Sequence, residues 1–296
     1  MLSVVLAVLA ALGNATASVL QRKANRDEPE GQARGLALFW HLVHRPAWLA
    51  GVAVLVVAFL LQAAALATGP IVVVQPVLVV ELAFTLMLAS MVFHSRLHAR
   101  EWTAIAGMSV GLAGMLYALQ PGGGDPHRAS IGRWGIGIVV SLAVAGVFIV
   151  LGYRAEGTRR AAYLGLATGI GFGLVAALVA GIGAAYSALG ISGVLWAPQT
   201  YLALVLGLGF FFLLQKALQA GPLVASQPAL TLVDPLVSVV FGIAVFDERL
   251  RTGTWLILAL FGAALIIVCT VLLARSPLLQ GSGGAESRST RSAEPD

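Results

Sequence analysis

The chain of 296 residues is 59% hydrophobic and only 10% charged, and its mean hydropathy is +0.92. Soluble domains are about 45–50% apolar and about 25% charged, so this composition excludes a soluble globular protein and predicts an all-α protein that crosses a membrane many times. The net charge of +5 comes mainly from arginines in the predicted loops and does not indicate a nucleic-acid partner. The single cysteine, Cys269, excludes an intramolecular disulfide.

Nine apolar stretches are long enough to cross a membrane as helices, which takes about 20 mostly apolar residues for a hydrocarbon core of roughly 30 Å. They are 1–20, 48–67, 70–93, 102–119, 134–153, 161–187, 198–219, 221–246 and 254–274. The first stretch has a second interpretation as a signal peptide, because Ala15-Thr16-Ala17 resembles a cleavage site. No positive charge precedes it, so a membrane-spanning helix is the favoured interpretation.

Basic residues gather on one side of the predicted membrane. Of the 18 lysines and arginines, that side holds Arg22, Lys23, Arg26, Arg34, Arg45, Arg96, Arg100, Arg154, Arg159, Arg160, Arg275, Arg288 and Arg291. By the positive-inside rule this side is cytoplasmic, which predicts a multi-pass plasma-membrane protein with its N-terminus outside and its C-terminus in the cytoplasm. Residues 275–296 are rich in Gly, Ser and charge, and we expect a disordered cytoplasmic tail there.

The chain contains an internal repeat. FLLQAAALATGPIVVVQP, which starts at Phe59, resembles FLLQKALQAGPLVASQP, which starts at Phe212. The match continues through the acids Glu81 and Asp234 and through Trp102 and Trp255. So many matches in the same order indicate a duplication.

The repeat divides the chain into three membrane parts. Residues 1–119 form a first repeat of four helices, residues 134–153 a connecting helix, and residues 161–274 a second repeat of four helices. Since the shift is five helices, the two repeats are predicted to have opposite topology. Inverted repeats are the architecture of many secondary transporters, with a site near the middle of the membrane between the halves.

The Gly-Pro, Gln-Pro and acid pattern of stretches 70–93 and 221–246, followed by DERL at 247–250, resembles the drug/metabolite transporter superfamily with its EamA-like repeats. QRKA at 21–24, the nine spans and the spacing from Gly-Pro to Gln-Pro resemble the branch that includes the NIPA-like magnesium transporters. The resemblance implies a transporter of a small metabolite or cation without a cofactor, in which Mg²⁺ or H⁺ is the transported or coupling ion. The first half departs from the pattern, with HSRL at 94–97 where the second has DERL.

Glu81 and Asp234 are the candidate coupling or ion-binding residues. At about 1.5 Å per residue Glu81 lies about 16 Å deep, near the middle of the membrane, and Asp234 is at an equivalent depth. A carboxylate there costs about 2.5–3.5 kcal/mol on insertion scales, so such a residue faces the bundle interior, pairs, or lines a pathway. The alternative is a protonated acid that hydrogen-bonds between helices as a packing device.

Other polar residues within spans are candidates for the substrate pathway. They are Asn14, Gln62, Gln75, Gln215 and Gln227. The inverted symmetry places one glutamine pair toward each face of the membrane, and interhelical amide bonds are the alternative role. Candidate helix breaks near the acids are Pro76, Pro228 and Pro235, each of which removes a backbone donor inside a span. No metal ligand set is assigned, although Mg²⁺ prefers oxygen ligands of the kind present here.

The sequence shows no Ser/His/Asp arrangement, no HExxH and no phosphate-binding loop, so the chain is predicted not to be an enzyme. His94 and His98 have a spacing that suits a metal on a helix, but a solvated loop is the favoured interpretation without a third ligand. The predicted partners are the lipid bilayer and a small-molecule or cation substrate, and a homodimer is left open. A membrane scaffold that does not transport and a membrane-embedded enzyme stay as alternatives.

Overall fold

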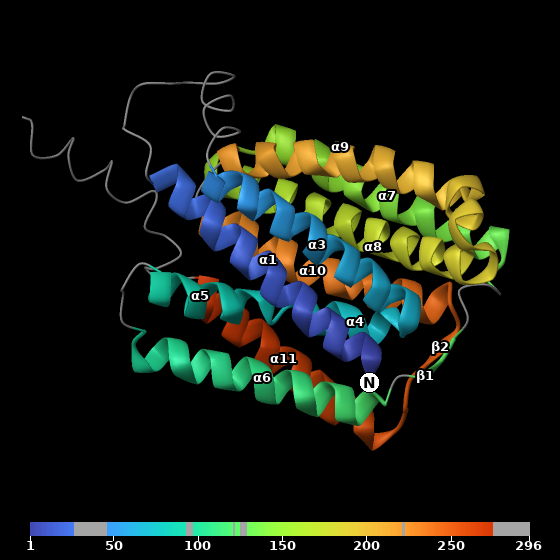
Figure 1. Ribbon diagram of the computed structural model, residues 1–296, viewed down its shortest axis with the longest axis horizontal. Helices are drawn as coiled ribbons and strands as arrows, with labels where there is room; N and C mark the ends of the chain where they lie inside the picture. Colours follow the sequence, from blue (N-terminus) through green and yellow to red (C-terminus); the bar gives the residue numbers. More distant parts are fainter. Residues whose placement is uncertain (27–45, 93–96, 121, 125–128, 221–222, 275–296) are drawn as a thin grey trace, which may run out of the picture.

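The computed structural model shows an all-α protein whose helices lie side by side in one bundle (Figure 1). It describes residues 1–26, 46–92, 97–120, 122–124, 129–220 and 223–274, so the predicted tail lies outside the described residues. The helices are α1 (Leu2–Arg26), α3 (Pro46–Thr68), α4 (Ile71–Leu78), α5 (Glu81–Val92), α6 (Ala99–Leu119), α7 (Ile131–Arg154), α8 (Gly157–Trp196), α9 (Pro198–Ala220), α10 (Leu223–Ala244) and α11 (Thr254–Ala274).

The apolar helices are those of a multi-pass membrane protein. Within the described residues, eight segments are long and apolar enough to cross a membrane, one of which consists of α4 and α5 together. Helix α10 adds a shorter apolar segment, Leu232–Ala244. Large apolar side chains lie on the outside of the bundle, for example Val139 on α7, Leu204 on α9 and Ile257 on α11. Soluble monomers seldom expose apolar surface on this scale, so the prediction of a multi-pass membrane protein is confirmed.

Two of the predicted spans differ from the helices observed. The stretch 70–93 is divided into α4 and α5 by a turn at Val79 and Val80. The stretch 161–187 belongs to the longer helix α8, which continues to Trp196 past a break at Gly190. Gly190 has φ 64° and ψ −146°, a backbone conformation that glycine adopts and that side-chain-bearing residues rarely do.

The helices form two groups by their contacts, and further helix pairs connect these groups. Helix α1 packs against α3, α4 and α5, whereas α8 packs against α7, α9 and α10. Helix α6 packs against α11, and α4 packs against α10. The pair α6 and α11 lies along one side of the bundle, next to α5 (Figure 1).

Glycines let some of these helices approach closely. A Cβ built at Gly173 on α8 would lie 2.7 Å from the Asp234 carbonyl oxygen of α10. One built at Gly111 on α6 would lie 2.8 Å from the carbonyl oxygen of Gly262 on α11. Small residues permit such backbone contact between membrane helices, where van der Waals packing rather than the hydrophobic effect drives association.

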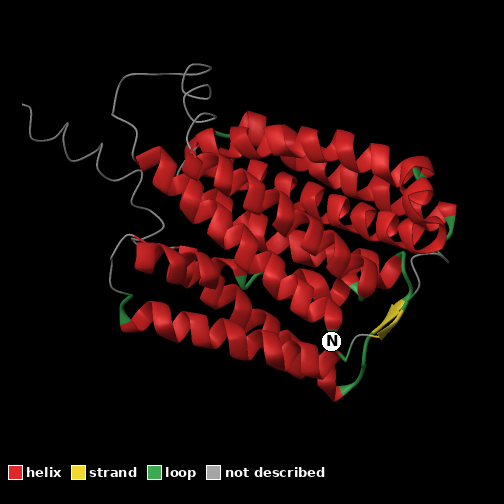
Figure 2. Cartoon of the chain, viewed as in Figure 1, coloured by secondary structure: helices red, strands yellow, loops and turns green. Residues whose placement is uncertain are grey.

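A short two-stranded antiparallel sheet lies at one end of the otherwise helical bundle (Figure 2). Strand β1 (Gly122–Gly123) pairs with β2 (Glu248–Arg249), with Gly122 opposite Arg249 and Gly123 opposite Glu248. The Arg251 N–H also donates to the Leu119 carbonyl oxygen at 2.8 Å. This two-stranded sheet therefore joins the α6–α7 connection to the α10–α11 connection, which the sequence pattern did not predict.

Candidate functional site

Glu81 lies at the point where the third membrane segment is interrupted. Pro76 has no N–H to donate, and after it the N–H groups of Val79 and Val80 donate to carbonyl oxygens only three residues back, at 3.3 and 3.1 Å. This tighter turn ends α4, and α5 begins directly at Glu81. The acid therefore lies in the first turn of α5, where the N–H groups of Leu82 and Phe84 donate to the carbonyl oxygens of Val79 and Val80 at 3.2 and 3.1 Å.

Asn14 of α1 is the hydrogen-bond partner of the Glu81 side chain. Helix α1 packs against both α4 and α5, so its middle turn faces the interruption between them. The Glu81 main-chain carbonyl also accepts a 2.8 Å hydrogen bond from Thr85 Oγ1. Glu81 keeps part of its surface exposed, as does Asn14.

Asp234 lies on α10 within electrostatic reach of Glu81. Its Oδ1 atom is 3.5 Å from the Oγ atom of Ser238, a fully buried hydroxyl one turn further along the helix. Gly173 of α8 lies against the main-chain carbonyl oxygen of Asp234, so α8 packs closely on α10 at this position. The structure thus brings together the two predicted acids and Asn14 from α1, α5 and α10.

The remaining predicted pathway residues are spread over the bundle. Gln75 on α4 is buried, and its Nε2 atom has no hydrogen-bond partner within the described part of the chain. Gln62 on α3 is half-buried, whereas Gln215 on α9 is exposed on the outer surface. The side chain of Gln227 lies outside the described residues.

The expected helix breaks are seen only near Pro76. Helix α10 is continuous from Leu223 to Ala244 and so runs through both Pro228 and Pro235. Helix α8 packs along this part of α10, and such neighbours allow a proline to be accommodated in a membrane helix without a break.

Glu248, in the DERL segment, has a role that the sequence interpretation missed. Its carboxylate accepts hydrogen bonds from the backbone N–H groups of Ile71, at 2.8 Å to Oε1, and Val72, at 3.0 Å to Oε2. The residue is only 6% exposed. Burial raises the pKa of the Glu248 carboxyl above its ordinary value of 4.5, and the two N–H donors only partly offset this effect. The available signal was an acid directly after an apolar helix, but its contact lies 177 residues away.

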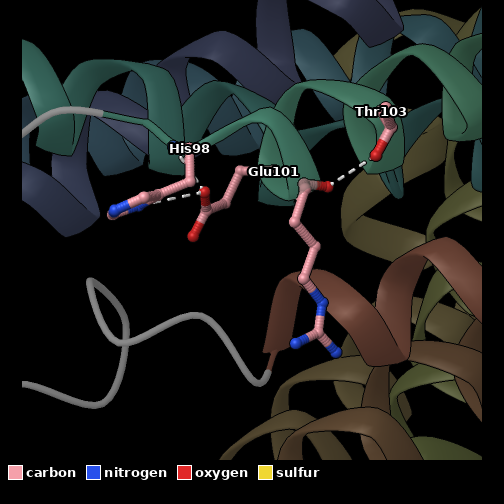
Figure 3. Close-up of polar contacts among 4 residues, drawn as sticks. His98, Glu101 and Thr103 are labelled. Carbon is pink, nitrogen blue, oxygen red and sulfur yellow. Dashed lines mark hydrogen bonds and ion pairs between the residues drawn. The ribbon is translucent and has the colours of Figure 1, made fainter.

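His98 lies at the start of α6, where it precedes the first helical residue. Its backbone N–H donates to Glu101 Oε2 at 2.6 Å, and its ring Nδ1 atom is 3.7 Å from the same oxygen (Figure 3). The His98 side chain is 83% exposed, and His94 lies outside the described residues. Within the described ranges no group of three or more His, Cys, Asp or Glu residues is placed to hold a metal ion.

The chain is 32% identical to an uncharacterized protein of Corynebacterium glutamicum over 280 residues, which cover 93% of this chain and 96% of that protein. The chain therefore belongs to the same family as that bacterial protein. No family model matches the chain, and no solved structure matches it.

Proposed function

We propose that this protein is a secondary-active transporter that moves a small metabolite or a cation by alternating access. The proposal depends on one observation, the electrostatic interaction between Glu81 and Asp234 within the bundle. In the described part of the chain neither carboxylate has a basic partner. Two neighbouring acids in a medium of low dielectric constant are most stable when a proton or a cation neutralises charge between them. Such a pair can couple ion binding to a change of conformation.

The proposed mechanism requires two inverted repeats, and the helix contacts support this arrangement. If residues 1–119 correspond to 161–274, the contacts of α1 with α3, α4 and α5 have counterparts in those of α8 with α9 and α10. The contacts α4–α10 and α6–α11 then each join equivalent helices of the two repeats. Because Glu248 follows α10 and contacts the first turn of α4, α10 ends on the face where α4 begins. These two equivalent helices therefore run in opposite directions.

Neutralisation of the acid pair is the step that we assign to the transport cycle. With a proton or cation bound, Glu81 and Asp234 no longer repel each other, so the two repeats can close around the site. Release of the ion restores the repulsion and favours the open arrangement. Asn14 orients the Glu81 carboxylate and Ser238 contacts that of Asp234, so each acid has one polar neighbour from the protein.

A divalent-cation transporter, with Mg²⁺ as the substrate, is the second candidate. The observation that favours it is the chemistry of the side chains at the site, where two carboxylates, one amide and one hydroxyl offer oxygen atoms. Hard cations prefer such ligands, and Mg²⁺ keeps several of its waters. Similarity to the drug/metabolite transporter superfamily and its NIPA-like branch is part of the proposal, as are the plasma-membrane location and the outward N-terminus. All three depend on the sequence features given in the sequence analysis.

Uptake into vesicles tests the proposal. Purified protein in lipid vesicles is supplied with Mg²⁺ or with metabolite mixtures under an imposed pH gradient, and flux is compared among variants. Glu81→Gln and Asp234→Asn should each reduce flux by about tenfold or more, which corresponds to about 1.4 kcal/mol. Asp247→Asn changes an exposed acid outside the site and should leave flux unchanged. Unaltered flux in both site variants would refute the site, and absence of any flux would favour a scaffold.

A further inference from the structure

The contact between Glu248 and α4 completes the start of a short helix. The first four N–H groups of any α-helix lack partners within the helix. In α4 the N–H groups of Val73 and Val74 donate to the Pro70 carbonyl at 3.0 and 3.1 Å, and Pro70 has no side chain that can cap the helix. Those of Ile71 and Val72 both donate to Glu248. The cap is therefore supplied from the other half of the chain.

The Glu248 side chain fits tightly among the segments around it. A Cβ built at Gly242 of α10 would lie 2.7 Å from Oε2, and one built at Gly124 would lie 2.6 Å from the Glu248 Cγ atom. The backbone of Glu248 is held by its pairing with Gly123. The carboxylate thus links α4 to the end of α10 and to the two-stranded sheet. We call this end of the bundle, which also holds residue 1 (Figure 1), the sheet end.

An ionised carboxylate is a costly way to cap a helix at a buried position. Burial raises the pKa of Glu248 in spite of its two hydrogen bonds, so desolvation outweighs what the ionised form gains from the helix. A serine or asparagine at the N-cap would satisfy a donor without this cost. The carboxylate joins α4 to the segment that follows α10, so its position favours a role in holding these two segments together rather than in helix stability alone.

Helix α4 connects this contact to the acid pair. It has only eight residues, about 12 Å at 1.5 Å per residue, and it ends at the turn before Glu81. Helix α10 carries Asp234 and leads directly to Glu248, and it packs against α4. A change at the Glu248 end can therefore move α4 as one rigid piece about the turn at Val79 and Val80.

We propose that Glu248 is the latch of a gate at the sheet end of the bundle: its carboxylate holds the first turn of α4 against α10, and release of this contact opens a path toward Glu81 and Asp234. The residue acts by positioning α4 and not by contact with the substrate. The inference rests on the alternating-access function proposed above. Its test measures thiol labelling rather than flux, so a failure of the latch can be distinguished from a failure of the proposed transport function.

Thiol labelling at two depths tests the latch. In a background in which Cys269 is replaced by alanine, single reporters Val72→Cys and Val77→Cys are placed on α4, where the native side chains are 0% and 1% exposed. Right-side-out and inside-out vesicles are treated with a membrane-impermeant maleimide. Each reporter is combined with Glu248→Ala, with Glu248→Gln, which keeps the shape and one acceptor oxygen, and with Asp247→Asn as the matched control.

We expect Glu248→Ala to raise the labelling rate of both reporters by about tenfold or more, Glu248→Gln to raise it by less, and Asp247→Asn to leave it unchanged. The rise should occur only in the vesicle orientation that exposes the sheet end. A rise at Val72 alone would overturn the proposal, because it would show a local helix cap without a gate. No rise at either reporter in Glu248→Gln protein that elutes as a folded species would overturn it as well.

Discussion

A close approach of the α6 and α11 backbones at Gly111 and Gly262 allows a quantitative prediction. A Cβ at Gly262 would lie 2.6 Å from the Gly111 carbonyl oxygen and 3.0 Å from the Met115 backbone nitrogen. Both are backbone atoms, so no rotamer change can relieve the clash. To reach the 3.4 Å at which ordinary contact begins, the two helices must separate by about 0.8 Å along this line.

Gly262→Ala should therefore destabilise the protein by about 1–3 kcal/mol, the usual cost of overpacking. The matched control is Gly114→Ala on α6, where a Cβ meets nothing within 4 Å. That change should be neutral or stabilising by up to about 1 kcal/mol, because alanine favours a helix more than glycine does.

The free energy of unfolding of the two variants is compared by titration with SDS in mixed micelles, followed by tryptophan emission. Adding Gly111→Ala to Gly262→Ala should cost less than the sum of the two single changes, since helices that have already separated accommodate the second methyl group. If Gly262→Ala unfolds at the same SDS fraction as Gly114→Ala, the argument that backbone contact holds this pair together is wrong.

Three further predictions concern charged groups outside the spans. Because the pKa of Glu248 is raised in the folded state, its contribution to stability is fully present below about pH 4.5 and is lost as the pH rises through the folded-state pKa. The thermal midpoint of the wild type should therefore fall relative to that of Glu248→Gln between pH 4 and pH 8. A difference in midpoint that stays constant over this range would contradict the prediction. Glu101→Ala removes the 2.6 Å acceptor for the His98 N–H and should cost about 0.5–2 kcal/mol in the same unfolding titration. Arg133→Ala breaks an exposed 3.5 Å ion pair with Asp247 and should cost less than about 1 kcal/mol in that titration, with a smaller effect at high salt.

The membrane spans were predictable because length and hydropathy alone define them. A run of about 20 apolar residues has few alternatives to a spanning helix, so each predicted stretch coincides with a helix or a pair of helices. Which side of each helix faces inward is a different matter. It depends on packing, and for that reason Gln215, which looked equivalent to other candidates in the sequence, lies on the outer surface.

The contacts of the candidate site could be predicted only in part. Two acids in matching positions of a repeat pointed to a shared site, and the structure places Glu81 and Asp234 within electrostatic reach. The role of Glu248 could not be found in this way, because its partners are backbone N–H groups, which carry no sequence signature. The effect of proline could not be predicted from the sequence either. Helix α4 ends shortly after Pro76, whereas α10 continues through Pro235.

The break at Gly190 has a consequence for how the protein sits in the lipid. The part of α8 before it would be about 50 Å long at 1.5 Å per residue, well above a hydrocarbon thickness of roughly 30 Å. The short segment after the break exposes Ile191, Leu195 and Trp196. Tryptophan concentrates at the level of the lipid headgroups, so we expect this segment to lie in the membrane–water interface. It would fix the depth of α8 in the membrane. Because α10 packs against α8, it would also fix the distance of Asp234 from the two membrane surfaces.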